Sequence, residues 1–185
     1  VLHEPNPVAG SALFLHTPAA RLIVWHHSDL VRPFWAPHTY WRLQRALYRR
    51  AECVIVSSPN LAEHSPLVRH ARRVVVIPFG IDETRWADVP PEPASGPIRA
   101  LFIGRLVRYK GVDILLRALE RVPDLRLDIV GTGPEAPRLR TLAQALAVTD
   151  RVRWYGEYPD EDIPRRMAES HFLVLPSVTS EEMFG

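Results

Sequence analysis

The chain has 185 residues, 46% of them hydrophobic and 24% charged, which is a globular composition with room for one ordinary domain or two small ones. The net charge is only +2 and arginines occur in every segment, so the sequence does not indicate a nucleic-acid-binding stripe. Cys53 is the only cysteine, which excludes an internal disulfide, and no apolar run approaches the roughly 18 residues that a membrane helix needs.

Apolar, β-branched runs recur through the first half of the chain, with helical patterns between them. Three such runs predict buried strands: residues 21–26, 52–58 and 73–78. Residues 40–50 place Trp41 and Leu47 mostly on one face of a predicted amphipathic helix. A short helix is expected after Pro59, and residues 3–7 are expected to form a rigid turn.

Residues 86–97 are rich in proline and poor in apolar side chains, so they are the best candidate for a linker between two domains, 1–85 and 98–185. The alternating pattern restarts after them. The predicted strands cover residues 98–104, 126–131, 151–156 and 171–177, and the predicted helices cover 112–122, 135–148 and 160–169.

Strands and helices that alternate at this spacing predict an α/β protein with two Rossmann-like, parallel-sheet halves and a cleft between them. Ligands of open parallel sheets bind at the carboxyl ends of the strands. The loops expected there are residues 104–110, 131–134, 156–160 and 176–185. We therefore expect the ligand-binding residues in these loops.

The loop 104–111, Gly-Arg-Leu-Val-Arg-Tyr-Lys-Gly, contains Lys110, the only lysine among 23 basic residues. Arg105 and Lys110 lie between a predicted strand and a helix N-terminus, where loop amides and the helix dipole attract anions. Arginine can bind two phosphate oxygens at once and lysine can reach them as a point charge, so the pair suits a diphosphate. A solvated basic loop is the alternative interpretation, and a GC-rich coding bias is the alternative reason for the lone lysine.

Gly131 and Gly133 lie in a second strand-to-helix loop, Gly-Thr-Gly-Pro. The third glycine of a dinucleotide-binding fingerprint is missing, because position 136 is alanine, and the loop follows the second strand of its half. An ordinary tight turn is the interpretation that the residues alone favour.

His26 and His27 stand at the end of the first predicted strand, followed by Ser28 and Asp29. Neighbouring strand residues point to opposite faces, so at most one histidine faces a cleft. A zinc site lacks a supporting cluster of His or Cys ligands, and a Ser-His-Asp triad is poorly supported because sequence neighbours do not make its geometry. The residues alone favour a structural histidine.

The last segment, Ser-Glu-Glu-Met-Phe-Gly at 180–185, follows the final predicted strand. A carboxylate in this loop can accept hydrogen bonds from sugar hydroxyls, although an exposed surface position is the ordinary one for glutamate.

Taken in order, these segments resemble one family, the retaining family-four glycosyltransferases of GT-B fold, also called glycosyl transferases group 1. The segments 101–119, 127–135, 152–170 and 172–185 are similar to the donor-binding domain of that family. The segments 3–10, 24–33, 57–66 and 74–82 are similar to the second half of its acceptor domain. The resemblance covers nearly the whole chain, and the ordered combination of motifs is more specific than any one of them.

The resemblance implies roles for single residues. The donor diphosphate would be bound by basic side chains, the transferred sugar would be contacted by a histidine and a glutamate, and loop residues would hold the nucleotide. The residues so implied are His27 and Glu182 as catalytic residues, Arg105, Lys110, Phe184 and Gly185 as donor-binding residues, and Gly131, Gly133, Glu157 and Tyr158 as nucleotide-loop residues.

The chain departs from the family pattern at both ends. The family's second glutamate would lie beyond Gly185, and the glycine-rich loop of the acceptor domain would lie before Val1. We therefore expect a chain truncated at both ends, with both halves incomplete and without activity by itself.

For the complete enzyme, the resemblance implies transfer of a hexose from a nucleoside diphosphate sugar to an acceptor hydroxyl with retention of the anomeric configuration. Arg105 and Lys110 would stabilise the leaving diphosphate, so no metal or other cofactor is expected. One alternative is a noncatalytic nucleotide-binding module or remnant of the same fold. Another is a dinucleotide-dependent oxidoreductase, which needs a Gly-x-Gly-x-x-Gly that neither visible half contains.

The expected partners are a nucleotide-sugar donor and a saccharide or lipid-linked acceptor, with no nucleic acid. We expect a cytoplasmic protein, and a peripheral contact with the inner face of the membrane stays open. A basic helix face suited to that contact would consist of Arg42, Arg45, Arg49 and Arg50, and a solvated face is the favoured alternative.

Overall fold

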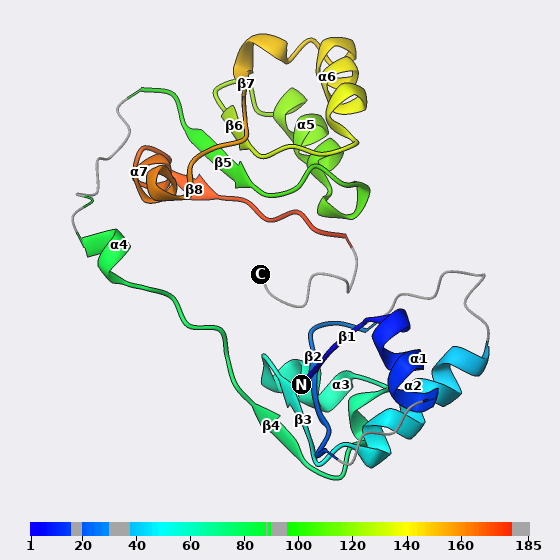
Figure 1. The fold of residues 1–185 in the computed structure, drawn as a ribbon. Coiled ribbons are helices and arrows are strands. Elements are labelled where there is room, and N and C mark those ends of the chain that lie inside the picture. The colour runs from blue at the N-terminus through cyan, green and yellow to red at the C-terminus, as the bar shows by residue number, and fades with distance from the viewer. Residues whose placement is uncertain (16–19, 30–37, 88, 90–95, 179–185) are drawn as a thin grey trace. The chain divides into compact units, whose positions relative to one another are not determined.

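The structure is a computed structural model, and it describes residues 1–15, 20–29, 38–87, 89 and 96–178 (Figure 1). The chain divides into two compact units, the first spanning Val1–Ile81 and the second beginning at Asp82. Each unit has its own parallel sheet and its own hydrophobic core. This is the α/β fold with two Rossmann-like halves that the sequence predicts.

The first unit contains a four-stranded parallel sheet in the order β1-β2-β3-β4. The strands are β1 (Leu2–Glu4), β2 (Ile23–His26), β3 (Cys53–Val56) and β4 (Val74–Val76), and the helices are α1 (Pro7–Leu15), α2 (His38–Arg50) and α3 (Pro59–His64), with a 3-10 turn at Val68–His70. Alternate strand residues enter the core: Val24 of β2 and Val54 of β3 are fully buried and share it with Leu47 and Tyr48 of α2.

The first residues differ from the rigid turn expected at 3–7. Leu2 and Glu4 are buried because β1 pairs with β2 along its whole length. The side chain of Asn6 then accepts a hydrogen bond from Ala9 N at 3.0 Å, so the Asn-Pro pair begins helix α1. Three strand residues are too few to show a pattern in the sequence, and the pairing with β2 decides their conformation.

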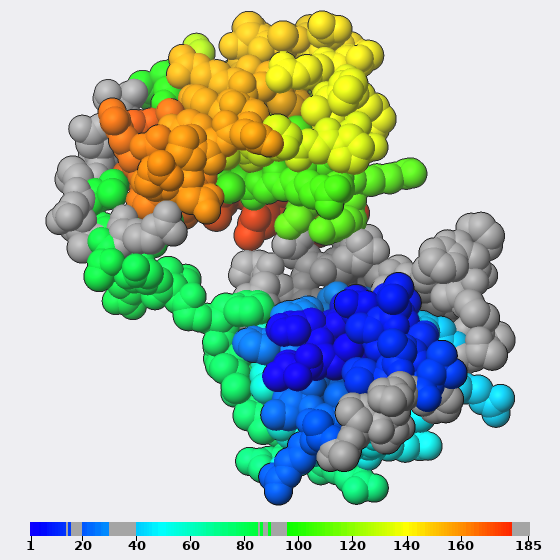
Figure 2. Space-filling view, in the orientation of Figure 1, coloured from blue at the N-terminus to red at the C-terminus, as the bar shows by residue number. Residues whose placement is uncertain are grey.

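The second unit contains a four-stranded parallel sheet in the order β7-β6-β5-β8. The strands are β5 (Arg99–Ile103), β6 (Arg126–Val130), β7 (Val152–Gly156) and β8 (Phe172–Leu173). The helices are α4 (Thr84–Ala87), α5 (Val112–Glu120), α6 (Ala136–Ala145) and α7 (Ile163–Ala168), and 3-10 turns cover Arg108–Lys110, Thr149–Arg151 and Asp160–Asp162. Figure 2 shows this unit as a packed body, with the region of α6 in yellow and the region of α7 in orange.

The two faces of this sheet bury different kinds of residue. Phe102 of β5 and Ile129 of β6 pack in a cluster with Leu116 of α5 and Leu139 of α6. Asp128, the next residue on β6, points to the opposite face and is only 1% exposed. One face is therefore an ordinary apolar core and the other contains a buried charge.

The order of the strands creates a topological switch point beside β5. The chain runs outward from β5 to β6 and β7, and then returns to the other side of β5 as β8. Such a reversal opens a crevice at the carboxyl ends of the strands, where ligands of open α/β sheets bind. The loops after β5 and β8 lie at this switch point, so they are the candidates for ligand binding.

The predicted elements of this unit are all present, with shorter bounds. β8 covers two residues rather than 171–177, because pairing with β5 is limited to Phe172 and Leu173, and Val174 N makes one more hydrogen bond to Leu101 O at 2.8 Å. The boundary between the two compact units falls after Ile81, so the predicted linker, 86–97, lies within the second unit. Residues 88 and 90–95 of it lie outside the described residues, so its role as a linker stays a prediction.

Candidate functional site

Two loops that follow neighbouring strands of the second unit are hydrogen bonded to each other. They are the loop after β5, residues 104–107, and the loop after β6, which begins at Gly131. Leu106 N donates to Thr132 O at 2.8 Å, and Glu135 N donates to Leu106 O at 3.1 Å. The loops therefore form one continuous edge at the carboxyl ends of the strands.

Gly131 and Gly133 are required by this contact. A Cβ atom on Gly131 would lie 2.0 Å from Gly104 O, and one on Gly133 would lie 2.3 Å from Leu106 O. Gly131 also has a φ of 128°, which favours glycine. The tight-turn interpretation of Gly-Thr-Gly-Pro describes this packing, and a role of the two glycines in nucleotide binding stays a prediction.

The two basic residues predicted to bind a diphosphate stand between β5 and α5. Arg105 is exposed, and Lys110 is half-buried with its ammonium nitrogen 5.7 Å from the centroid of the Tyr109 ring. Lys110 ends a 3-10 turn, and Gly111 then begins α5 at once. The positive end of the α5 dipole therefore lies next to Lys110, so an anion bound here would be stabilised by both.

The same loop contacts the segment after β8. Gly111 has a φ of 67°, and a Cβ atom on it would lie 2.2 Å from Pro176 O. Val178 N donates to Tyr109 O at 2.9 Å. The loop that carries Lys110 is thus held at the switch point between β5 and β8.

Glu157 and Tyr158 lie in the loop after β7, which in turn contacts the loop after β6. Gly156 has a φ of 70°, and its carbonyl accepts a hydrogen bond from Gly131 N at 2.7 Å. Glu157 is exposed, whereas Tyr158 is half-buried and its hydroxyl accepts a hydrogen bond from Arg166 Nη2 at 3.1 Å. The structure therefore brings three of the predicted ligand loops to one edge of a single sheet.

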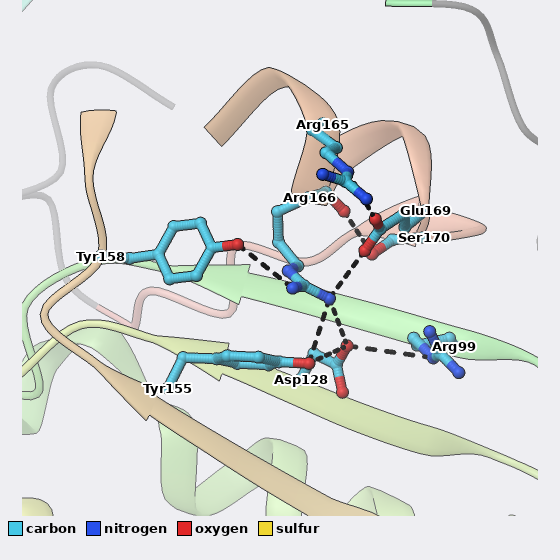
Figure 3. A network of polar contacts seen from close by, with 8 residues as sticks. All are labelled: Arg99, Asp128, Tyr155, Tyr158, Arg165, Arg166, Glu169 and Ser170. Atoms are coloured by element: carbon cyan, nitrogen blue, oxygen red, sulfur yellow. Dashed lines mark hydrogen bonds and ion pairs between the residues drawn. The ribbon is translucent and has the colours of Figure 1, made fainter. Parts of the chain in front are cut away.

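A polar network surrounds Arg166 of α7 (Figure 3). Arg166 Nη1 donates to Glu169 at 2.8 Å and to the Tyr155 hydroxyl at 3.1 Å. The Tyr155 hydroxyl donates to Asp128 at 3.3 Å, and Arg99 Nε lies 3.9 Å from the same carboxylate oxygen. Since Asp128 is almost fully buried, these side chains rather than water are the partners of its carboxylate.

Sequence reasoning did not identify this network. Its one visible signal is Asp128, a carboxylate within an apolar strand, which requires a partner when buried. Burial lowers the pKa of Arg166, but its hydrogen bond with Tyr158 and the nearby Tyr155 and Glu169 outweigh this effect and hold the pKa above its ordinary value. Arg166 therefore stays charged within the network.

In the first unit, the two adjacent histidines point to opposite faces, as strand alternation predicts. His26 is fully buried, with Nδ1 2.6 Å from the Tyr48 hydroxyl and Nε2 3.3 Å from Ser65 Oγ. Because the Ser65 hydroxyl donates to Asp29 at 2.8 Å, its oxygen is left to accept from His26 Nε2. His26 is a structural histidine, and Ser65 does not donate to it as the serine of a catalytic triad would.

His27 lies on the other face in a group of stacked rings. Its centroid is 5.2 Å from that of His3, 5.7 Å from that of Trp25 and 6.5 Å from that of Phe79. His27 Nε2 lies 2.9 Å from His3 Nδ1. Burial, followed by the nearby His3 and His26, lowers the pKa of His27, so its imidazole is more readily neutral and can accept as well as donate a hydrogen bond.

Glu4 forms a second buried polar cluster in this unit, which sequence reasoning also missed. Its carboxylate accepts hydrogen bonds from Asn6 N at 3.0 Å, from Gln44 Nε2 at 3.2 Å and from the Tyr40 hydroxyl at 3.4 Å. Burial and the Glu4 charge raise the pKa of Tyr40, which keeps its phenol protonated. Glu4 thus ties the turn between β1 and α1 to helix α2.

Residues 85–185, more than half of the chain, match the family model described as "Glycosyl transferases group 1". The chain belongs to this family. Two curated relatives extend the similarity over 99% of the chain at 31% identity: the O-antigen chain mannosyltransferase C of Escherichia coli and the D-rhamnosyltransferase WbpZ of Pseudomonas aeruginosa. The chain covers 50% of the first and 49% of the second, so it spans about half the length of the curated relatives it matches.

Solved structures of similar fold match nearly the whole of this group 1 glycosyltransferase chain. The sucrose-phosphate synthase of Thermosynechococcus elongatus matches with a TM-score of 0.76 at 23% identity, over 99% of this chain and 51% of that one. HepE of Anabaena, solved in complex with UDP-glucose, matches with a TM-score of 0.73 at 25% identity, over 96% of this chain and 52% of that one. The two parallel-sheet halves are therefore those of the GT-B fold.

Three predicted site residues of this group 1 glycosyltransferase chain, Glu182, Phe184 and Gly185, lie outside the described residues. Among the residues that the structure does describe, no cluster of three His, Cys, Asp or Glu side chains has the arrangement of a metal site. Within the same ranges, no helix combines the length and the apolar character needed to cross a membrane.

Proposed function

We propose that the protein carrying this chain transfers a hexose from a nucleoside diphosphate sugar to an acceptor hydroxyl, with retention of the anomeric configuration. The observation that carries the proposal is the position of Arg105 and Lys110, in one loop at the switch point and beside the N-terminus of α5. The proposal is supported by membership of the family and by the names of the relatives, which transfer mannose and rhamnose.

The residues of the loop after β5 would act on the leaving group. As the bond between the anomeric carbon and the diphosphate breaks, negative charge grows on the diphosphate and positive charge on the sugar. Arg105, Lys110 and the α5 dipole would stabilise the negative charge, and preorganised groups of this kind typically contribute about 10²- to 10³-fold to the rate. The nucleotide sugar is then the only small molecule required besides the acceptor, with no metal or cofactor.

The sugar itself would be oriented by His27 and Glu182. A neutral imidazole, which the lowered pKa of His27 favours, can accept a hydrogen bond from a sugar hydroxyl. A carboxylate at Glu182 would accept another, and amides near Phe184 and Gly185 would hold the donor. The acceptor is proposed to be a saccharide or a lipid-linked saccharide, in keeping with the name of the O-antigen relative.

A peripheral membrane contact is the remaining part of the proposal on partners. Arg42, Arg45 and Arg49 are exposed at a spacing that places them on one face of α2, whereas Arg50 donates to Leu13 O at 3.4 Å. Three arginines on one face suit anionic headgroups, and a solvated face is the alternative. Co-sedimentation with anionic vesicles distinguishes the two.

The direct test uses the protein expressed from its whole gene, with a panel of UDP- and GDP-sugars and saccharide acceptors. We expect release of the nucleoside diphosphate coupled to glycoside formation, and nuclear magnetic resonance of the product reports the anomeric configuration. Nucleotide binding without any sugar transfer would favour a noncatalytic module of the same fold instead.

A further inference from the structure

We propose that Arg166 is a positioning residue: by holding Tyr158, it fixes the loop after β7 and so determines how strictly the protein discriminates between nucleobases. The inference rests on the proposed function, because it assigns a part of the donor to this loop. It concerns a residue of α7 that has no place in the transfer step itself.

The loop after β7 is continuous with the loops that carry the predicted diphosphate ligands. The Gly156 carbonyl accepts from Gly131 N at 2.7 Å, and Leu106 N, next to Arg105, donates to Thr132 O at 2.8 Å. Adjacent strands lie about 5 Å apart, so β5 and β7 are separated by about 10 Å. A nucleoside is about that long, so a diphosphate near Lys110 allows the base to reach the loop after β7.

Two hydrogen bonds of the described residues are central to how this loop is held. The first is the Gly156 carbonyl bond, and the second is the hydrogen bond of 3.1 Å from Arg166 Nη2 to the Tyr158 hydroxyl. A Cβ atom on Gly156 would meet nothing within 4 Å, so the loop is not packed at that point. Beyond Gly156, the anchoring of Tyr158 therefore restricts the backbone of Glu157.

The Tyr158 ring is turned toward the network rather than away from the protein (Figure 3). Its centroid lies 5.7 Å from that of Tyr155 in an edge-on arrangement and 5.5 Å from the Arg166 guanidinium carbon. Tyr158 thus acts as an anchor. The exposed Glu157 side chain and the loop backbone remain available to a base.

Arg166 is itself held on several sides. Its side chain is only 15% exposed, it donates to Glu169 at 2.8 Å, and its guanidinium carbon lies 4.3 Å from the centroid of Tyr155. Asp128, on the adjoining strand β6, lies 4.0 Å from Arg166 Nη1. The Tyr158 hydroxyl is therefore held by an arginine that is itself fixed by Asp128 of the sheet and Glu169 of α7.

A fixed backbone can discriminate between bases because its donors and acceptors have one spacing. A wrong base then leaves polar groups unpaired, which costs affinity. A loop that loses its anchor can adapt to either base but must be ordered on binding, which lowers affinity for the correct one. Loosening the anchor should therefore reduce the preference for one base while leaving diphosphate binding unchanged.

The test measures dissociation constants of UDP, GDP and inorganic pyrophosphate by calorimetry, with the protein expressed from its whole gene. For Tyr158→Phe, which removes only the hydroxyl, and for Arg166→Met, we expect the preferred nucleotide to bind roughly tenfold more weakly, in line with one lost hydrogen bond to a charged group. The ratio of the UDP and GDP constants should move toward one, and the pyrophosphate constant should not change.

Arg165→Met is the matched control, because Arg165 is a neighbouring arginine of α7 that donates to the same Glu169 at 3.1 Å but is 78% exposed. It should bind all three ligands like the wild type. If Arg166 acts through Tyr158, the double variant Tyr158→Phe/Arg166→Met should bind the preferred nucleotide no more weakly than Arg166→Met alone.

An unchanged UDP-to-GDP ratio in Tyr158→Phe would overturn the inference, as would an equal loss for pyrophosphate or a wild-type protein without base preference. Each of these results leaves the proposed function standing, because the wild type still binds a nucleoside diphosphate. A wild-type protein that binds none of the three ligands would overturn the proposed function and this inference together.

Discussion

Lys110 and His27 belong to different units and differ in how their surroundings affect their charge. Lys110 stands next to the positive end of α5, so a bound anion would relieve unfavourable interactions between like charges. His27 has a lowered pKa because burial and His3 disfavour its charged form. The first residue is therefore suited to bind negative charge and the second to form neutral hydrogen bonds.

The lowered pKa of His27 predicts a change of stability with pH. In the window between the lowered value and about 6.5, the unfolded chain binds more protons than the folded one, so the folded state loses stability as the pH falls through it. We expect the difference in unfolding free energy between pH 7.5 and 5.5 to be smaller in His27→Gln than in the wild type, measured by urea unfolding. His64→Gln, which changes an exposed histidine of α3, is the control, and equal pH dependence in His27→Gln and the wild type would refute the prediction.

The ends of the elements depend on residues far away in the sequence. Arg151 Nη1 lies 2.8 Å from Leu119 O, 2.8 Å from Val122 O and 3.3 Å from Pro123 O, so one guanidinium satisfies the carbonyls at the end of α5. A cation at this position also complements the negative end of the helix dipole.

Arg151→Met should therefore lower the unfolding free energy by about 1 to 3 kcal/mol, the usual range for hydrogen bonds from a charged donor. Urea unfolding measures it. Arg153→Met, two residues further along on β7 and exposed, should be nearly neutral. Equal effects of the two substitutions would show that the α5 carbonyls do not depend on Arg151.

The contact between the loops after β5 and β6 can be tested with two glycines of similar backbone conformation. Gly131 has a φ of 128° and Gly96 a φ of 106°, but a Cβ atom would clash with Gly104 O only at Gly131, whereas at Gly96 it would meet nothing within 4 Å. Both alanine variants have backbone strain, and Gly131→Ala adds overpacking of about 1 to 3 kcal/mol. Thermal unfolding that lowers the melting temperature equally in both would contradict the loop contact.

The sequence predicted the strands that contain a continuous apolar run, such as β2 and β3, because short apolar, β-branched runs between turn signals are typical of buried strands. It did not predict β1, whose three residues are strand only because they pair with β2. It also missed the networks around Glu4 and Arg166, since their members are distant in sequence and only the fold brings them together. The loop of Lys110 was identifiable because its residues are contiguous.

At the scale of the molecule, two parallel-sheet units of one chain match about half the length of the two curated relatives. The two curated relatives are similar to the chain over both units. The hydrogen bonds between loops explain how the second unit positions its loops at the carboxyl ends of its strands. The proposed transfer needs positive charge at the diphosphate, which Arg105 and Lys110 would provide.

Because that charge would come from side chains, we expect that removal of divalent ions does not affect catalysis. We expect turnover of a nucleotide sugar by the protein expressed from its whole gene to be unchanged in excess EDTA. Loss of turnover that Mg²⁺ or Mn²⁺ restores would contradict the proposal that basic side chains alone stabilise the leaving group.

The most direct test of the account is the effect of Lys110→Ala on turnover, with Arg108→Ala as the matched control. Both residues are basic and belong to the same 3-10 turn, and Arg108 is exposed. The account predicts a loss of about 10²- to 10³-fold in kcat for Lys110→Ala, as for other preorganised charge-stabilising groups, and a change of less than about threefold for Arg108→Ala. Unchanged turnover in a folded Lys110→Ala protein would contradict it.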